Sequence, residues 1–535
     1  MSDTALNPSR KRKQRTPARR LRFRLELIVF VLLFAKSSAP AAEIASNGIG
    51  GGAWSDPTTW RGRKVPTADD DVAIQKNDVV TFGRGDGKPT CRKLQIDPKG
   101  GLTFKTGAGK LVFTVSDGIE TFGAIRLDGT KSASDEFEIR LIGDAATKRV
   151  IKLGKGGALL LYGRANLPDG KRNVALVAPP DKEQAPGLVE CNGAAMIDWQ
   201  RATIKDVKLY AIGLDNTGAK ANERLRVADN SCTGMSRLYC QGCDTPEIVR
   251  NQFDNIGGKA TGEAAINAHT CPLAEIKDNV IKGGFPVGIG IYVAVDNVVT
   301  ANTIEKCNIG IQGGYGVPNV MIKNATIRGC DTGVKLEGAS GVVENVVVEG
   351  ATTAFYQTTC KLQITSFRFK ELAKKGIAVE FDSGTLSLLN CELKPDEIKV
   401  VPRKPDPAKP PPPEIVTCLQ YVVVKAADAP KGTLVEVRTA APAPPPGVSD
   451  ANVRNSPAPI NDGLTPLPKD LMPVIVKAWA FNPQGQFVKG PDYAIKLLGL
   501  APKGGPTAQC SRCKRSARRL QHSAPTRVTR RRLWR

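Results

Sequence analysis

Histidine, the side chain most often used for general acid–base catalysis, is almost absent from this 535-residue chain, which contains two. His522 lies in an Arg-rich tail, and His269 stands alone in the segment Ala268-His269-Thr270-Cys271. A catalytic triad needs a histidine held by an acid beside a nucleophile, and this segment contains no nucleophile elbow. We interpret His269 as a surface or coil-corner residue, and no catalytic residue is assigned.

Paired cysteines are a possible metal signal. The Cys-x-x-Cys pairs at Cys240/Cys243 and Cys510/Cys513 each have half the spacing of a zinc ribbon. One pair lies on a predicted coil and the other in the tail, so we do not expect them to share a metal, and neither a metal nor another cofactor is predicted. Thirteen cysteines scattered over a large chain suit an oxidising compartment but do not form a disulfide scaffold.

A repeat of 21 to 24 residues provides the frame for the remaining side chains. Two independent markers recur at this period, an inward apolar residue and a small residue that opens the following strand. The apolar marker occurs at Ile281, Ile304, Ile327, Val348, Phe369 and Leu393. The small marker occurs at Gly288, Gly310, Gly333, Ala354 and Gly376. The period predicts an all-β fold with a parallel β-helix over roughly Leu225 to Leu393, because each coil can bury its inner face only by stacking. The repeat is clearest after residue 250.

Asparagines precede the apolar marker in most coils, at Asn279, Asn302, Asn324, Asn345 and Asn390. Asparagine tolerates the left-handed conformation of a sharp corner, and its amide can bond to a stacked neighbour. The pattern resembles the asparagine ladders of pectate-lyase-like right-handed β-helices. Separate Asx turns without a ladder would predict the same fold, and in either case these residues are structural.

Alignment of the second strands places two rows of side chains on the outer surface. One row contains Gly290, Gln312, Lys335, Tyr356 and Glu380, and the other contains Tyr292, Gly314, Glu337, Thr358 and Asp382. The candidate ligand-binding residues are Tyr292, Gln312, Lys335, Glu337 and Tyr356, which would suit sugar contacts, although an ordinary solvated face has the same composition. The rows do not offer the carboxylates on neighbouring coils that a pectate-lyase-like calcium site would need. The Gly-His-Gly of polygalacturonase-like hydrolases is also absent.

The segment after the leader has its own pattern of turns and aromatic residues. It contains Trp54, Trp60, Gly62, Val65-Pro66 and Asp70-Asp71-Val72, followed by short strands separated by Gly, Asp or Pro. Over residues 50–165 this order resembles the G8 domain of extracellular β-helix proteins. The resemblance implies a β-rich module stacked on a β-helix, and it points weakly to a polysaccharide because some members are linked to hyaluronan.

The formal charge of +24 is concentrated in the tails. Residues 1–24 carry +8 and residues 503–535 carry +11, which leaves +5 for the 478 residues between them. Phosphate binding needs basic residues clustered on a folded face, so we expect no nucleic-acid binding by the folded body.

The amino terminus has the order of a secretory signal: a basic stretch from Arg10 to Arg24, an apolar stretch from Leu25 to Ala35, and Ala39-Pro40-Ala41. The apolar stretch is shorter than the ~20 residues that span a bilayer. We predict cleavage after residue 41 and a secreted or cell-surface location, with an uncleaved anchor as the alternative. No transmembrane span is expected beyond the leader.

The predicted organisation therefore comprises a signal peptide (1–41), a G8-like β module (48–180), parallel β-helix repeats (181–400), a Pro-rich linker (401–414), a small C-terminal β module (415–500) and a basic disordered tail (501–535). The predicted function is a polysaccharide-binding protein or an envelope component without assignable catalysis. The alternatives are a polysaccharide lyase or glycoside hydrolase acting on a groove of the β-helix, and a purely architectural spacer.

Overall fold

The computed structural model describes residues 43–86, 88–107, 109–131, 134–144, 148–167, 171–179, 185–193, 195–214, 224–255, 262–372, 377–391, 393–401, 415–425, 433–439, 465–466, 471–490 and 493–500. The predicted signal peptide, all but one residue of the Pro-rich linker and the basic tail lie outside these residues, as do Cys510, Cys513 and His522. Among the described residues, no helix combines the length and the apolar character needed to cross a bilayer.

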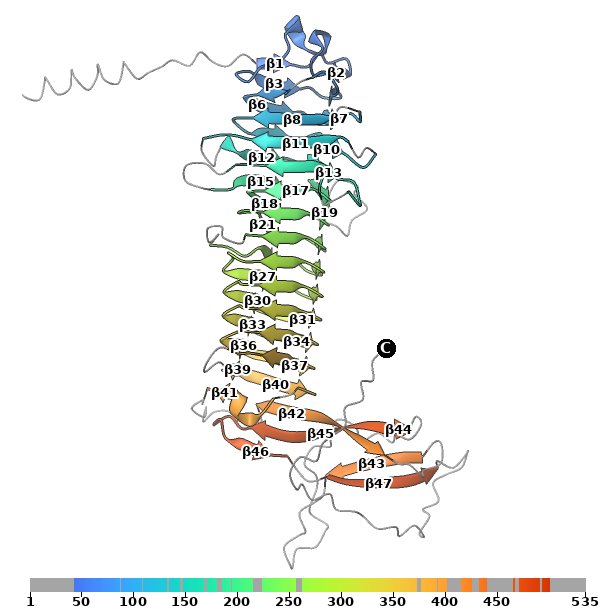
Figure 1. Cartoon of the computed structure of the whole chain (residues 1–535), viewed down its shortest axis with the longest axis vertical. Helices are drawn as coiled ribbons and strands as arrows, with labels where there is room; N and C mark the ends of the chain where they lie inside the picture. Colours follow the sequence, from blue (N-terminus) through green and yellow to red (C-terminus); the bar gives the residue numbers. More distant parts are fainter. Residues whose placement is uncertain are drawn as a thin grey trace, which may run out of the picture.

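The described chain forms a long column in which short strands stack coil upon coil in three sheets (Figure 1). Neighbouring strands are parallel throughout the column. Sheet 1 consists of β1 (Glu43–Ala45), β3 (Asp71–Ile74), β6 (Lys93–Ile96), β9 (Ile119–Thr121), β12 (Val150–Leu153), β15 (Gly187–Asn192), β18 (Val207–Ile212), β21 (Arg237–Gln241), β24 (Ile266–His269), β27 (Val287–Tyr292), β30 (Ile309–Gly314), β33 (Thr332–Glu337), β36 (Thr353–Thr358), β39 (Ile377–Phe381) and β41 (Ile398–Val400).

Sheet 2 follows sheet 1 in each coil. It consists of β2 (Gly51–Ala53), β4 (Val79–Phe82), β7 (Gly101–Phe104), β10 (Ala124–Asp128), β13 (Ala158–Tyr162), β16 (Met196–Gln200), β19 (Arg224–Ala228), β22 (Glu247–Val249), β25 (Glu275–Lys277), β28 (Val298–Thr300), β31 (Val317–Lys323), β34 (Ala339–Glu344), β37 (Cys360–Thr365), β40 (Gly384–Leu389), β42 (Val416–Lys425), β45 (Leu471–Phe481) and β46 (Phe487–Lys489).

Sheet 3 completes the coils. It consists of β5 (Thr90–Cys91), β8 (Lys110–Val115), β11 (Glu136–Leu141), β14 (Val174–Val177), β17 (Thr203–Lys205), β20 (Ser231–Thr233), β23 (Gln252–Asp254), β26 (Val280–Lys282), β29 (Thr303–Glu305), β32 (Thr326–Arg328), β35 (Val347–Glu349) and β38 (Arg368–Lys370). In the described part of the chain, the 3₁₀ turns η1 (Pro57–Thr59), η2 (Arg61–Arg63) and η5 (Pro395–Glu397) lie outside the sheets.

The core runs through the centre of the column as stacked rows of inward side chains. Ile281, Ile304, Ile327 and Val348 are register partners on successive strands of sheet 3, and none has measurable exposure. Side chains alternate between the two faces of a strand, so one apolar residue in each three-residue strand fills the interior. The predicted parallel β-helix and its period in this region are confirmed.

The small residues that open the strands of sheet 1 also have a steric explanation. A Cβ at Gly310 would lie 2.6 Å from the carbonyl oxygen of Gly333 and 2.6 Å from a methyl carbon of Ile327. Gly288 and Gly333 meet the equivalent carbonyl oxygens of their own neighbouring coils. The close approach between coils therefore selects glycine at this corner.

The first coils are less regular than the later ones but belong to the same three sheets. In sheet 1, Ile119 pairs with Ile151, and Ile151 pairs with Val189, although both intervals in the sequence are longer than those of the later coils. Strand stacking continues through β12, β15 and β18 without a boundary near residue 180. The amino-terminal strands thus form the first coils of the column, and a separate G8 module is not confirmed.

Two tryptophans pack at the amino-terminal end of the column. Trp54 and Trp60 are both 2 % exposed, and the indole N–H of Trp60 donates to the carbonyl of Trp54 at 2.8 Å. The Trp54 ring lies 5.0 Å from that of Phe82 and 5.4 Å from that of Phe113. This aromatic cluster covers the interior where the stack of coils begins.

At the other end, the strand direction changes. β42 extends sheet 2 in parallel with β40, and β45 then pairs antiparallel with β42, and β46 with β45. A fourth, separate sheet lies beyond β45 and β46 and consists of β44 (Thr465–Pro466), β43 (Thr433–Thr439) and β47 (Tyr493–Leu500) (Figure 1). β42, β45 and β46 are thus continuous with the last coils through sheet 2, whereas β43, β44 and β47 form a separate sheet.

Candidate functional site

The asparagine ladder is real but occupies a different set of coils from the one predicted. Its four members are buried and stacked, and each side-chain amide donates both to a backbone carbonyl and, in the first three, to the next asparagine. The amide-to-amide distances are 3.0, 3.1 and 3.1 Å. The ladder consists of Asn230, Asn251, Asn279 and Asn302.

Three of the predicted members, Asn324, Asn345 and Asn390, occupy the adjacent corner position instead. They are exposed and have φ angles of 54°, 51° and 52°, so they supply the left-handed corner residue. The ladder position in the coil after Asn302 is filled by Ala325, which is buried. These three residues therefore do not belong to the buried ladder, although the Asn345 amide donates to Asn324 Oδ1 at 2.8 Å in the exposed corner column. The prediction merged two neighbouring columns.

The sequence contained the signal that separates the columns. Asn279 lies two residues before its inward isoleucine, whereas Asn324 lies three residues before Ile327. The two missed members, Asn230 and Asn251, lie two residues before the buried Cys232 and Phe253.

The structure brings the predicted ligand-binding residues together on the outer surface of sheet 1. Gly290, Gln312, Lys335 and Tyr356 are register partners on successive strands, and Tyr292 pairs with Gly314 two positions further along. Glu337 lies on the same strand as Lys335. The predicted rows are therefore those found in the structure, whereas their role in binding stays a prediction.

Tyr292 has an unusual setting on this surface. A Cβ at Gly290 would lie 2.8 Å from the Tyr292 ring, and one at Gly314 would lie 3.5 Å from it. The ring thus occupies the space directly outside two glycines, where any larger residue at position 290 would displace it. Two glycines therefore let this tyrosine ring lie over the sheet.

Further aromatic side chains adjoin Tyr292. The Tyr315 ring lies 6.3 Å from it and is 77 % exposed, and the His269 ring lies 6.3 Å away on the other side. Tyr210 and Tyr239 stack at 4.8 Å on earlier coils. Five of the eight tyrosines of the chain lie along this face, which we call the tyrosine face: Tyr210, Tyr239, Tyr292, Tyr315 and Tyr356. The prediction missed Tyr210 and Tyr239 because it aligned only the coils after residue 285, and it missed Tyr315 because this residue follows the end of β30 and belongs to neither row.

Charged side chains lie at the two ends of the tyrosine face and are paired. Lys335 contacts Glu337 at 2.9 Å and lies 5.6 Å from the centre of the Tyr356 ring. At the other end, Lys208 contacts Glu263 at 2.8 Å and lies over the rings of both Tyr210 and Tyr239. The rings at both ends therefore already have a cation beside them, whereas Tyr292 and Tyr315 do not have one in any described contact.

Two buried polar atoms under the middle of the tyrosine face lack a hydrogen-bond partner among the described residues. They are Asn267 Oδ1 and His269 Nδ1, both on β24. Burial raises the pKa of Tyr292, with smaller contributions from Tyr315 and Glu337, so the phenol remains neutral. The middle of the face therefore combines a neutral tyrosine ring with the polar side chains of Asn267 and His269, whose unpaired atoms lie beneath the surface.

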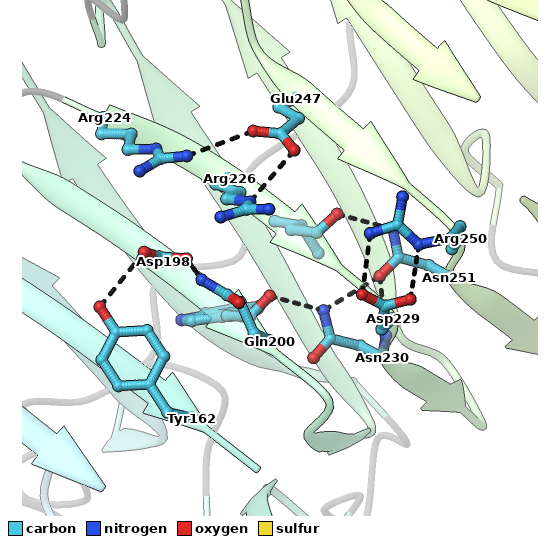
Figure 2. Close-up of polar contacts among 12 residues, drawn as sticks. Tyr162, Asp198, Gln200, Arg224, Arg226, Asp229, Asn230, Glu247, Arg250 and Asn251 are labelled. Carbon is cyan, nitrogen blue, oxygen red and sulfur yellow. Dashed lines mark hydrogen bonds and ion pairs between the residues drawn. The ribbon is translucent and has the colours of Figure 1, made fainter. Parts of the chain in front are cut away.

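A second polar cluster lies on sheet 2 (Figure 2). Asp198 is 4 % exposed and accepts from the Tyr162 hydroxyl at 3.2 Å and from the Gln200 amide at 2.8 Å. Glu247 forms ion pairs with Arg224 at 3.3 Å and Arg226 at 3.1 Å. Figure 2 also shows the ladder residues Asn230 and Asn251, with the corner pair Asp229 and Arg250 beside them.

This cluster is poorly arranged for general base catalysis. Burial and the neighbouring Asp198 raise the pKa of Tyr162 to about 12, which keeps the phenol protonated near neutral pH. Both oxygens of Asp198 are occupied and almost covered, so a substrate cannot reach them without rearrangement. The charges of the cluster are better explained as a paired network on the strand surface.

The described cysteines are buried free thiols. Cys307 and Cys330 occupy equivalent positions on adjacent coils, two residues beyond the paired Glu305 and Arg328. No group of three or more potential ligand residues among the described residues could hold a metal ion.

Comparison with known proteins agrees with this architecture. Residues 236–395 match the family model described as the right handed beta helix region. The chain is thus a right-handed parallel β-helix in this part, which contains the coils from β21 to β40. No curated protein matches the chain.

Proposed function

We propose that the protein is exported and binds a polysaccharide through the tyrosine face. The observation that carries the proposal is the Tyr292 ring, which lies over Gly290 and Gly314 beside the 77 % exposed Tyr315. One side of a pyranose ring presents C–H groups, which contact the electron-rich face of an aromatic ring favourably. A tyrosine ring lying over a sheet is well placed for such a contact.

The surrounding groups support the same proposal. Gln312, Asn267 and Gln241 point outward on neighbouring strands of the tyrosine face. Amides can both donate to and accept from sugar hydroxyls. Export is supported by the basic, apolar and Ala-x-Ala order of residues 10–41.

The alternative, a polysaccharide lyase or hydrolase, receives less support from the geometry. Such enzymes need an acid or base that is open to substrate. The carboxylate of Glu337 is paired with Lys335, that of Glu380 with Lys399, and that of Asp382 accepts from Thr358. A reducing-sugar release assay on bound polysaccharides would reveal the activity if these pairs open on binding.

Affinity electrophoresis of the full chain in gels containing different polysaccharides tests the proposal. We expect at least one polysaccharide to retard the protein, and Tyr292→Ala and Tyr315→Ala to abolish most of the retardation. Tyr162→Ala removes a tyrosine from the outer surface of sheet 2 and is the matched control, which should migrate like the original protein. Unchanged retardation of the Tyr292→Ala and Tyr315→Ala variants, with native circular dichroism, would refute binding at the tyrosine face.

A further inference from the structure

We infer that the ligand of the tyrosine face is an uncharged, extended glycan that lies along the column axis with about one sugar ring per coil. This inference rests on the proposed function and specifies the ligand class and the direction in which it binds. It differs from the hyaluronan link implied by the G8 resemblance, because hyaluronan is an acidic polymer.

The first argument is the absence of charge from the middle of the face. On β21, β24, β27 and β30, the two outward rows contain no Lys, Arg, Asp or Glu. The eight positions are Tyr239, Gln241, Asn267, His269, Gly290, Tyr292, Gln312 and Gly314. We call these positions the neutral window. A polymer with a carboxylate on alternate sugars would leave these charges without a cation to pair with.

The second argument is that the nearest described cations are already paired. Lys208 and Arg237 both contact Glu263, at 2.8 and 3.0 Å. Lys335 contacts Glu337 at 2.9 Å. A uronate or sulfate would therefore compete with Glu263 or Glu337 for these cations, which offsets part of the gain.

The third argument is the spacing of the coils. Strands in a sheet are about 4.8 Å apart, close to the length that one pyranose adds to an extended β-linked chain. A glycan that lies along the column would therefore place successive rings beside successive coils. Tyr292 ends β27, Tyr315 directly follows β30 on the next coil, and their rings are 6.3 Å apart, so adjacent sugars could stack on adjacent tyrosines.

The hydrogen-bonding groups follow the same axis. Gln241, Asn267 and Gln312 lie on β21, β24 and β30, and all three side chains are partly exposed, although Asn267 Oδ1 itself is buried. A hydroxyl-rich chain running across these coils would supply donors and acceptors to each amide in turn. The neutral window spans four coils, so about four sugars should saturate it.

Isothermal titration calorimetry with the full chain tests both parts of the inference. The probes are cello-, xylo- and manno-oligosaccharides of two to six residues, with oligogalacturonates and hyaluronan oligosaccharides of matched length. We expect a neutral series to bind, its affinity to rise up to about four residues and then level off, and its affinity to be insensitive to salt. Tyr292→Ala should weaken this binding at least tenfold.

Gln312→Lys adds one cation to the neutral window and gives a second measurement on a folded protein. It should add a salt-dependent gain in affinity for acidic oligosaccharides relative to the original protein, since the basic tail is the same in both. Tight, salt-dependent binding of acidic chains by the original protein, lost in Tyr292→Ala, would overturn the inference and leave the proposed function standing. A disaccharide that binds as tightly as a hexasaccharide would overturn the axial arrangement. Failure of every polysaccharide to retard the protein in gels would instead overturn the proposed function itself.

Discussion

The same chemical change at two asparagines distinguishes the ladder from the corner column. Asn279→Asp keeps the side-chain shape at a buried ladder position, and Asn345→Asp makes the identical change at an exposed corner. In the ladder, the Asn279 amide donates to the carbonyl of Ile248 at 2.9 Å and to Asn302 Oδ1 at 3.1 Å. A carboxylate cannot donate either bond and would face two acceptors instead.

The expected cost follows from these two contacts. Each buried group left without its partner costs ~1–3 kcal/mol, so Asn279→Asp should destabilise the protein by about 2–6 kcal/mol before any penalty for burying the charge. The Asn251 N–H groups that donate to Asn279 Oδ1 keep their acceptor, and no cavity forms. Asn345 loses one exposed bond to Asn324 at 2.8 Å, and aspartate also tolerates its left-handed conformation, so Asn345→Asp should change stability by no more than ~0.5 kcal/mol.

Urea denaturation of the full-length variants, followed by far-ultraviolet circular dichroism, measures the difference. Because repeat proteins often unfold in several steps, the midpoint of the transition that includes the middle coils is the quantity to compare. Equal shifts for the two variants would refute the division of the asparagines into a buried ladder and an exposed corner column.

Three further predictions concern the core, the acid stability and the amino terminus. Ile327→Ala should lower the free energy of unfolding by about 2–5 kcal/mol because the side chain is fully buried, and an unchanged thermal midpoint would contradict the core register. For Asp70, burial raises the pKa, but hydrogen bonds from Lys64 and Thr67 outweigh this effect and hold the pKa below its ordinary value. A carboxyl group with a depressed pKa stabilises the folded protein above the pKa of the unfolded chain, ~3.9, and this stability is lost as the pH falls through the pKa of the folded state. The Asp70→Asn variant lacks this carboxyl group, so it should lose less stability on acidification than the original protein does. Thermal melts of both proteins at pH 6 and pH 3 measure the difference. Intact-mass analysis of the exported protein should place its first residue near Ala42, whereas a chain that retains residues 1–41 would indicate an anchor.

The later coils could be predicted from sequence because their length is nearly constant. With coils of 21 to 24 residues, the column of inward apolar residues from Ile281 to Val348 fixes the register of the strands. The outward row from Gln312 to Tyr356 follows from that register. Each strand of sheet 3 in these coils buries one apolar side chain at a fixed position, so a simple count of residues was sufficient there.

The earlier coils could not be predicted in the same way. Segments of variable length interrupt the period, so Ile119, Ile151 and Val189 stack although the intervals between them are unequal and longer than a later coil. The unusual turns around Trp54 and Trp60 then suggested a separate module. The position of Tyr292 over two glycines was also beyond the sequence, because it depends on a contact between residues of neighbouring coils.

The way in which the two ends of the column are closed has a consequence for valency. Parallel strands at an open end would present unpaired backbone groups to which another copy could add. At the amino-terminal end, Trp54 and Trp60 cover the first coils. At the carboxy-terminal end, β45 pairs antiparallel with β42, and Gly485 in the turn after β45 lies against Val400 of β41. With both ends partly covered in this way, a single chain would offer one tyrosine face, so avid attachment to a polymer would require several chains side by side.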